Sequence, residues 1–127
     1  MADDQKQIQA LSDEYQQLQA ELEEAIGARE KLEAQQQENT SVQKEFKTLD
    51  DDANIYKLIG PILLKQDKSE AVMAVDGRLD FIEKEINRIE KQIAEVQEKS
   101  EMKKGEIIQL QAQMQQQPQA GGAPVAA

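Results

Sequence analysis

The sequence lacks the residues on which most catalytic and metal sites depend. It contains no cysteine and no histidine among its 127 residues. These absences remove disulfides, thiolate ligands, the strongest thiol nucleophile and the commonest general base. The six glycines form neither of the glycine-rich patterns that cradle phosphates. The sequence therefore predicts a protein that is not an enzyme and that holds no cofactor or metal.

Large apolar side chains are also scarce. Two residues are phenylalanine, two are tyrosine and none is tryptophan, and no apolar run approaches the ~20 residues of a membrane-spanning helix. Because 31% of the residues are charged, the composition is typical of long helices rather than of a globule with a large core. The acidic N-terminus has no secretory or transit pattern. We therefore expect a single cytoplasmic domain.

Positive charge is in the minority. Fifteen lysines and arginines stand against 25 acids, which leaves a net charge of −10. Nucleic acids and anionic membrane surfaces require clustered basic residues. A helix lying on a membrane would likewise need lysine or arginine beside its apolar stripe. The charge balance therefore predicts partners that are neither nucleic acid nor membrane.

One strongly apolar stretch, residues 54–66, interrupts this polar chain. It is rich in β-branched and aliphatic residues and is divided by Gly60-Pro61, a dipeptide that marks turns. The pattern predicts a β-hairpin with both faces mostly apolar. A lone hairpin is marginal in water, and burial of both faces needs further strands or covering layers. We therefore expect hairpins from several chains to share one β structure. The alternative is an apolar turn packed on the ends of two helices.

Polar segments with heptad spacing flank the hairpin on both sides. The first predicts a helix over 4–50, and the second predicts a helix over 69–117. The stripe of the second helix keeps its spacing without a slip, although the polar residues Ser100 and Lys103 interrupt its apolar character near the far end. The stripe of the first helix falters after Leu32 and is expected to resume one residue out of phase, with Asn39, Val42, Phe46 and Leu49. Equal lengths and a short connection favour antiparallel pairing within the chain. Pairing with helices of other chains is the alternative.

Two further segments have simple interpretations. Asp50, Asp51 and Asp52 are expected to be a solvated helix end, because three consecutive acids lack the spacing of a calcium loop. Residues 118–127 are small and polar, so we expect a disordered tail. A partner-binding tail is the alternative.

Several apolar residues of the second helix lie off its stripe. Met73 and Phe81 lie near the hairpin, where they are expected to brace the β structure. Met102 and Ile108 lie near the far end, and together with apolar residues of the first helix they exceed what a two-helix seam needs. Flexible aliphatic and methionine side chains suit an adaptable binding surface. Helix fraying or a helix-end contact with a neighbouring chain is the alternative.

Residues 54–90 carry a specific resemblance, and the heptads around them extend it over about 5–116. The pattern resembles the β-type subunits of the prefoldin family, in which a single hairpin distinguishes the β type from the α type. On this resemblance residues 1–117 form one domain. The matching residues are Tyr56 to Asp67, then Glu70, Ala71, Val75, Arg78, Leu79, Phe81, Ile82, Glu85, Ile86 and Arg88.

The resemblance implies a mainly α fold: a long antiparallel two-helix coiled coil joined by one β-hairpin that contributes to an intermolecular β-barrel platform. It implies a subunit of a hetero-hexamer, with two α-type and three further β-type subunits as partners. Such a complex is an ATP-independent molecular chaperone. It binds unfolded proteins such as actin and tubulin at the coiled-coil tips and delivers them to the cytosolic chaperonin.

The resemblance also implies roles for two sets of residues. Those expected to build the platform are Ile55, Tyr56, Leu58, Ile59, Gly60, Pro61, Ile62, Leu63 and Leu64. Those expected to contact clients are Ile8, Leu11, Tyr15, Met102, Ile107, Ile108, Leu110 and Met114. The alternative to a chaperone is a coiled-coil scaffold or tether that binds one folded partner.

Overall fold

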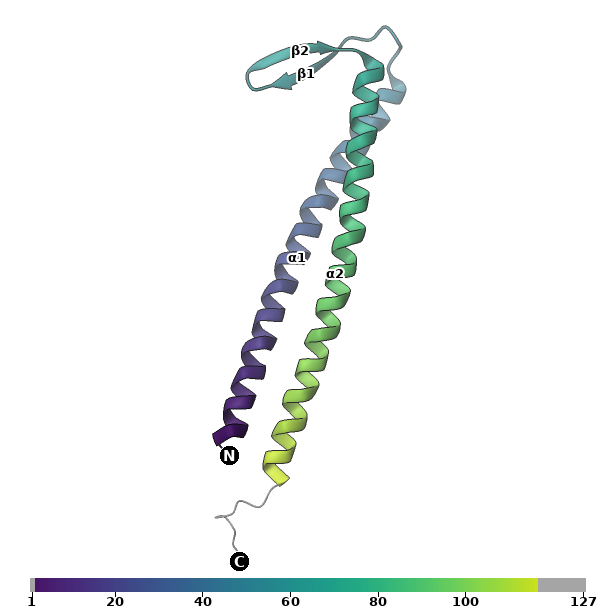
Figure 1. The fold of residues 1–127 in the computed structure, drawn as a ribbon. Helices are drawn as coiled ribbons and strands as arrows, with labels where there is room; N and C mark the ends of the chain where they lie inside the picture. The colour runs from purple at the N-terminus through teal and green to yellow at the C-terminus, as the bar shows by residue number, and fades with distance from the viewer. Residues whose placement is uncertain (1, 117–127) are drawn as a thin grey trace, which may run out of the picture. The chain divides into compact units, whose positions relative to one another are not determined.

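The computed structural model describes residues 2–116 and consists of two helices joined by a hairpin (Figure 1). The elements are α1 (Ala2–Thr48), β1 (Ile55–Ile59), β2 (Ile62–Gln66) and α2 (Lys68–Gln116). This order confirms the expected mainly α fold class. Compared with the expected bounds, α1 begins and ends two residues earlier and α2 begins one residue earlier. The expected tail, 118–127, lies outside the described residues.

The two helices contribute to two compact units. One unit contains α1 up to Ile26 and α2 from Gln92, and the other spans Gly27–Lys91 and includes the hairpin. Because the hairpin reverses the chain, the helix segments of each unit run antiparallel (Figure 1). Within residues 2–116, neither helix has a stretch both long and apolar enough to cross a membrane.

The seam between the helices is lined mainly by small and β-branched residues of α2. In the hairpin-bearing unit the buried residues are Ala71, Val75, Ile82, Ile86 and Ile89, and in the other unit they are Ala25, Val96 and Ser100. Most follow steps of three and four, as in a coiled coil. None of the described side chains is fully enclosed, because each is covered by a single facing helix. The core is therefore one layer of side chains.

On α1 the inward-facing stripe continues without a slip, contrary to the sequence expectation. The half-buried positions from Arg29 onward include 29, 32, 36, 39, 43 and 46, which follow steps of three and four. Positions 33, 40 and 49 are also half-buried, so of the residues expected after the slip only Val42 lies off the seam. Val42, expected on the seam, is 39% exposed. Gln43 takes the seam position and donates a hydrogen bond to Asp76 of α2 at 2.8 Å. The expectation of a slip was wrong because it followed apolar residues, whereas glutamine and asparagine occupy this part of the stripe.

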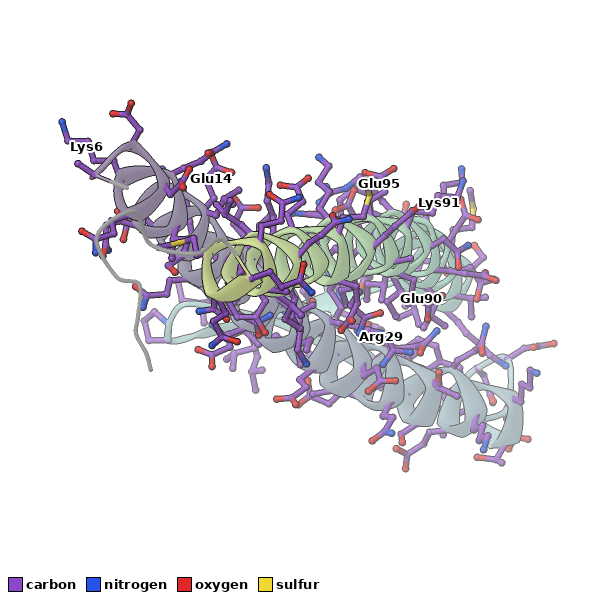
Figure 2. The ribbon with its side chains drawn as sticks, turned by 90° about the horizontal axis from the view of Figure 1, so that it is seen from below. Lys6, Glu14, Arg29, Glu90, Lys91 and Glu95 are labelled. Atoms are coloured by element: carbon purple, nitrogen blue, oxygen red, sulfur yellow. The ribbon has the colours of Figure 1, made fainter. Side chains whose placement is uncertain are left out.

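Arg29, a half-buried residue of the α1 stripe, forms an ion pair across the seam. Its guanidinium donates hydrogen bonds to Glu90 of α2 and to Glu33 of α1, both at 2.8 Å, and Figure 2 shows Arg29 and Glu90 directed toward one another. The hydrogen bond to Glu90 is the main cause of a raised pKa for Arg29. Since these side chains are one-third to one-half exposed, the pairs contribute little to stability. They favour one register of α1 against α2.

A comparison of Gln36→Leu with Gln37→Leu tests the unbroken stripe. Gln36 is half-buried on the seam and Gln37 is exposed. We expect Gln36→Leu to raise the free energy of unfolding by about 1 kcal/mol, because a half-buried leucine removes apolar area from water. Gln37→Leu and Val42→Ser should stay within about 0.5 kcal/mol, as surface changes do. Urea unfolding followed by circular dichroism measures the free energy of unfolding of all three variants. A large loss of stability in Val42→Ser would instead support the slipped register, in which Val42 lies on the seam.

Candidate functional site

The hairpin is closed by a two-residue turn at Gly60-Pro61. β1 and β2 pair antiparallel, with Ile59 opposite Ile62. Gly60 has a φ of 58°, the conformation that its lack of a Cβ allows. Pro61 restricts the next φ to a negative value. Glycine first and a negative φ second are the features of a type II′ turn, whose twist matches that of the flanking strands.

The paired register gives the hairpin two apolar faces. One face carries the pairs Tyr56–Lys65 and Leu58–Leu63, and the other carries Ile55–Gln66, Lys57–Leu64 and Ile59–Ile62. Each face therefore contains several large apolar side chains and one lysine. The two lysines are the only charged residues of the strands.

These apolar side chains are open to solvent in the single chain. Leu58 is 68% exposed and its partner Leu63 is 63% exposed. All the residues expected to build the platform lie on this hairpin, and all except half-buried Ile55 are exposed. An apolar surface of this kind on both faces of a two-stranded sheet marks an interaction site. The alternative of an apolar turn packed on the helix ends is wrong.

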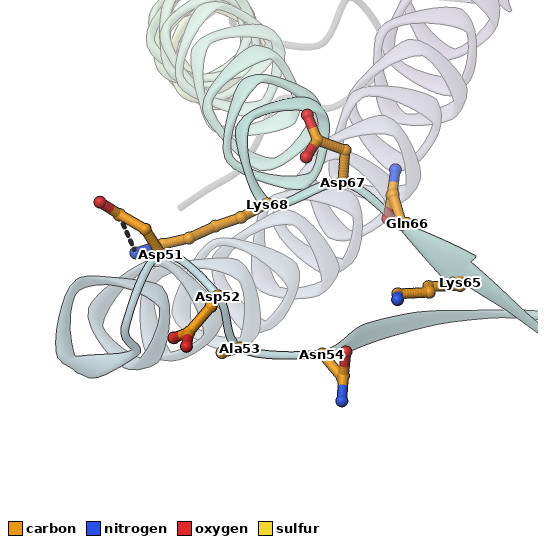
Figure 3. Close-up of a pocket in the computed structure, with 8 residues that line it drawn as sticks. All are labelled: Asp51, Asp52, Ala53, Asn54, Lys65, Gln66, Asp67 and Lys68. Carbon is orange, nitrogen blue, oxygen red and sulfur yellow. Dashed lines mark hydrogen bonds and ion pairs between the residues drawn. The ribbon is translucent and has the colours of Figure 1, made fainter.

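A polar junction attaches the hairpin to the helices (Figure 3). The ammonium of Lys68, at the start of α2, donates to the carbonyl of Leu49 at 2.7 Å and pairs with Asp51 at 3.3 Å. A cation here complements the carbonyls exposed at the end of α1. The carbonyl of Asp67 accepts the Ala71 N–H at 2.9 Å, which begins the helical hydrogen bonds of α2. Lys68 therefore links both ends of the connection.

The junction contains an open hollow of about 420 Å³, lined by Asp51, Asp52, Ala53, Asn54, Lys65, Gln66, Asp67 and Lys68. The expectation that Asp50–Asp52 form only a solvated helix end misses the role of Asp51, because Lys68 is 17 residues away in sequence. No group of three acidic side chains in the described part of the chain is arranged to hold a metal ion.

The eight residues expected to contact clients fall into two groups in the other unit. Met102 is 60% exposed and Ile108 is 56% exposed. They lie six residues apart on α2, which separates them by about 120° around the helix axis, and Gly105 lies between them in sequence. The remaining six are half-buried along the seam: Ile8, Leu11, Tyr15, Ile107, Leu110 and Met114. Only the first group is accessible without separation of the helices.

Polar side chains interrupt the seam of this unit, at positions where the sequence shows serine and lysine. The Gln19 amide donates to the hydroxyl of buried Ser100 at 2.6 Å. Lys103 pairs with Glu14 at 2.7 Å, and this hydrogen bond raises the pKa of the lysine. The partners on α1 were not predicted, because the polar residues of α2 alone do not identify what faces them. Such pairs favour one register at a cost in stability.

Comparison with known proteins identifies the family. A family model described as "Prefoldin subunit" matches residues 9–116 of this chain. Prefoldin subunit 6 of Saccharomyces cerevisiae is 53% identical over 100 residues, which cover 79% of this chain and 88% of that protein. Prefoldin subunit 6 of Homo sapiens is 41% identical over 121 residues, 94% of each chain.

The fold gives the same answer as the sequence comparison. The crystal structure of the prefoldin beta subunit from Thermococcus strain KS-1 superposes with a TM-score of 0.74 at 26% identity, covering 80% of this chain and 89% of that one. The beta2 subunit from the same strain has a TM-score of 0.63 and shares the fold. Prefoldin subunits form complexes with one another and act as chaperone components. The resemblance seen at the hairpin motif is thereby confirmed, and the chain belongs to the prefoldin family.

Proposed function

We propose that this chain is a holdase subunit of a hetero-hexameric prefoldin complex in the cytosol. Two α-type and three further β-type subunits complete the complex. It binds unfolded proteins such as actin and tubulin at the coiled-coil tips, without ATP, and delivers them to the cytosolic chaperonin. The observation that supports this best is the hairpin, whose apolar residues, apart from half-buried Ile55, are 49–68% exposed on both faces.

The exposure of these apolar side chains to water is unfavourable, and assembly removes it. Burying one leucine or isoleucine side chain contributes roughly 1.5–3 kcal/mol, and the hairpin offers six such side chains: Ile55, Leu58, Ile59, Ile62, Leu63 and Leu64. A shared sheet covers them with equivalent hairpins and also pairs the open strand edges. Met102 and Ile108 are the accessible part of the proposed client surface. Both are exposed, so their side chains do not stabilise the fold by burial.

A coiled-coil scaffold that binds one folded partner is the second candidate. The exposed apolar pair Met102 and Ile108 favours the holdase, because an adaptable apolar surface recognises many non-native chains rather than one native shape. The two functions differ in their response to a panel of unrelated denatured proteins. A holdase suppresses aggregation of them all, whereas a scaffold affects none of them.

The hairpin's part in assembly is tested by replacing Leu58 and Leu63 together with aspartate. The two residues are cross-strand partners, so the change places two carboxylates opposite each other and removes apolar burial worth about 3 kcal/mol or more. We expect native mass spectrometry to show the affinity for other prefoldin subunits reduced more than ~100-fold. Helical circular dichroism should be nearly unchanged. Leu58→Ile with Leu63→Ile is the matched control and should assemble. A doubly aspartate-substituted chain that still assembles would rule out the shared sheet.

The client surface is tested in the assembled complex with Met102→Ser and Ile108→Ser. Each change removes an exposed apolar contact worth about 1 kcal/mol, or about 2 kcal/mol for the pair, so we expect the affinity of the doubly substituted complex for denatured actin to fall about 30-fold. Light scattering during dilution of the denatured client gives the readout. Lys104→Ser with Gln109→Ser is the control, because it adds the same number of serines to the same turns. Equal loss in both variants would contradict a specific role for the apolar pair, and removal of residues 1–16 and 101–127 should abolish suppression by this subunit.

A further inference from the structure

The connection between α1 and β1, residues 49–54, has little apolar packing to hold it in place. No residue between Ala25 and Ala71 is buried. Hollows of about 420, 440 and 250 Å³ lie around the place where α1, the hairpin and α2 meet. A segment with few buried apolar contacts has low local stability. In a single chain, the restraint on this connection therefore comes mainly from polar contacts.

One side chain of α2 makes such a contact. The ammonium of Lys68 donates a hydrogen bond to the carbonyl of Leu49 at 2.7 Å and lies 3.3 Å from the carboxylate of Asp51. Figure 3 shows the side chain extended from the start of α2 toward Asp51. Lys68 also lines all three hollows. Within residues 2–116, it is the side chain that links the connection to α2 by hydrogen bond or ion pair.

The position of this lysine is unfavourable for α2 alone. Lys68 is the first residue of α2, where the unpaired N–H groups of a helix carry a partial positive charge, whereas the last carbonyls of α1 carry a partial negative one. The Lys68 side chain is 21% exposed, so its bond to Leu49 is sheltered from water. Asp51 is fully exposed, so the ion pair contributes little. The bond to the Leu49 carbonyl is therefore the main effect of the lysine.

With this bond, the connection is held at both ends against one short segment. Leu49 is bonded to Lys68, and Ile55 pairs with Gln66 in the hairpin ladder. Gln66 and Lys68 are two residues apart, with only Asp67 between β2 and α2. Without the Lys68 bond, six residues would separate the end of α1 from the first ladder pair with no link to α2 at their start. The bond therefore reduces the freedom of the hairpin relative to α1.

We propose that Lys68 is a positioning residue for assembly, which restrains the hairpin before the subunits meet. The inference rests on the proposed shared sheet and names a residue outside the hairpin that promotes its formation. Ordering of a flexible interface during association lowers affinity, and an interface that is ordered in advance avoids this loss. Lys68 acts through the connection and makes no contact with the strands that enter the sheet.

The restraint is tested in the isolated full chain with Lys68→Met, which removes the ammonium and keeps an unbranched side chain. The amide of Ala53 donates to the Asp50 carbonyl at 3.0 Å, and the amide of Leu49 donates to the Phe46 carbonyl at 3.3 Å. We expect both amides to exchange with solvent deuterium about tenfold faster or more, as loss of a hydrogen bond to a charged group implies. Amides at 82–96 in α2 should exchange as before, and helical circular dichroism should be unchanged.

The effect on assembly is measured by native mass spectrometry of titrations with the other prefoldin subunits. We expect Lys68→Met to lower the affinity about tenfold. Lys47→Met is the matched control, because it removes the same charge from the last turn of α1, and it should assemble like the unsubstituted chain. Lys68→Arg keeps a cation with N–H donors and should restore most of the affinity. Asp51→Asn keeps the Leu49 bond and should also assemble normally.

Unchanged exchange and unchanged affinity in Lys68→Met would overturn the proposal, and so would faster exchange without loss of affinity. Equal losses of affinity in Lys68→Met and Lys47→Met would show an effect of charge alone and refute the positioning role. A loss as large in Asp51→Asn would contradict the assignment to the Leu49 carbonyl. If the unsubstituted chain formed no complex, the proposed assembly would fail and the positioning role with it. The exchange rates would still show whether Lys68 restrains the connection, so the two failures are distinguishable.

Discussion

The exposure of both apolar faces of a two-stranded sheet is the constraint on which the rest of this structure depends. The register places Leu58 against Leu63 on one face and Ile59 against Ile62 on the other, so no rotation of the hairpin hides both pairs from water. The helices offer no cover, because their own apolar residues meet in a single layer between them. A lone hairpin of this kind is marginal in water, and the family to which the chain belongs is one of complex-forming subunits.

The seam between the helices is asymmetric in composition, and this asymmetry explains its behaviour. α2 contributes buried β-branched residues such as Ile82, Ile86 and Ile89. The half-buried stripe of α1 in the same unit contains the polar residues Gln36, Asn39 and Gln43. Apolar residues on one helix remove area from water, and polar residues on the other restrict the pairing through bonds such as Gln43 to Asp76. Such a seam favours a defined register with modest stability. In the unit that holds the chain ends, Ser100 and Lys103 extend this polar character into α2.

The surfaces that remain apolar lie where the seam does not need them. Met73 and Phe81 flank Gly77 in one unit, and Met102 and Ile108 flank Gly105 in the other. In both places a Cβ on the glycine would meet no side chain or facing element within 4 Å. Non-native chains are the proposed occupants of the Met102 and Ile108 surface. Because α2 packs on one side only, its other side can present separate binding surfaces at different places along the helix.

The sequence by itself determined the two helices, the hairpin with its turn at Gly60, the regular spacing of the α2 stripe and the family, because periodicity and turn chemistry are local properties. Only the tertiary structure decided the rest. The place of Gln43 rather than Val42 on the seam, the bond from Lys68 to Leu49, and the partners of Ser100 and Lys103 all join residues far apart in the chain. Polarity alone does not predict them, because a glutamine or a lysine is suited to water as well as to a seam. Whether such a side chain faces water or lies on the seam depends on the residue that the other helix places opposite it.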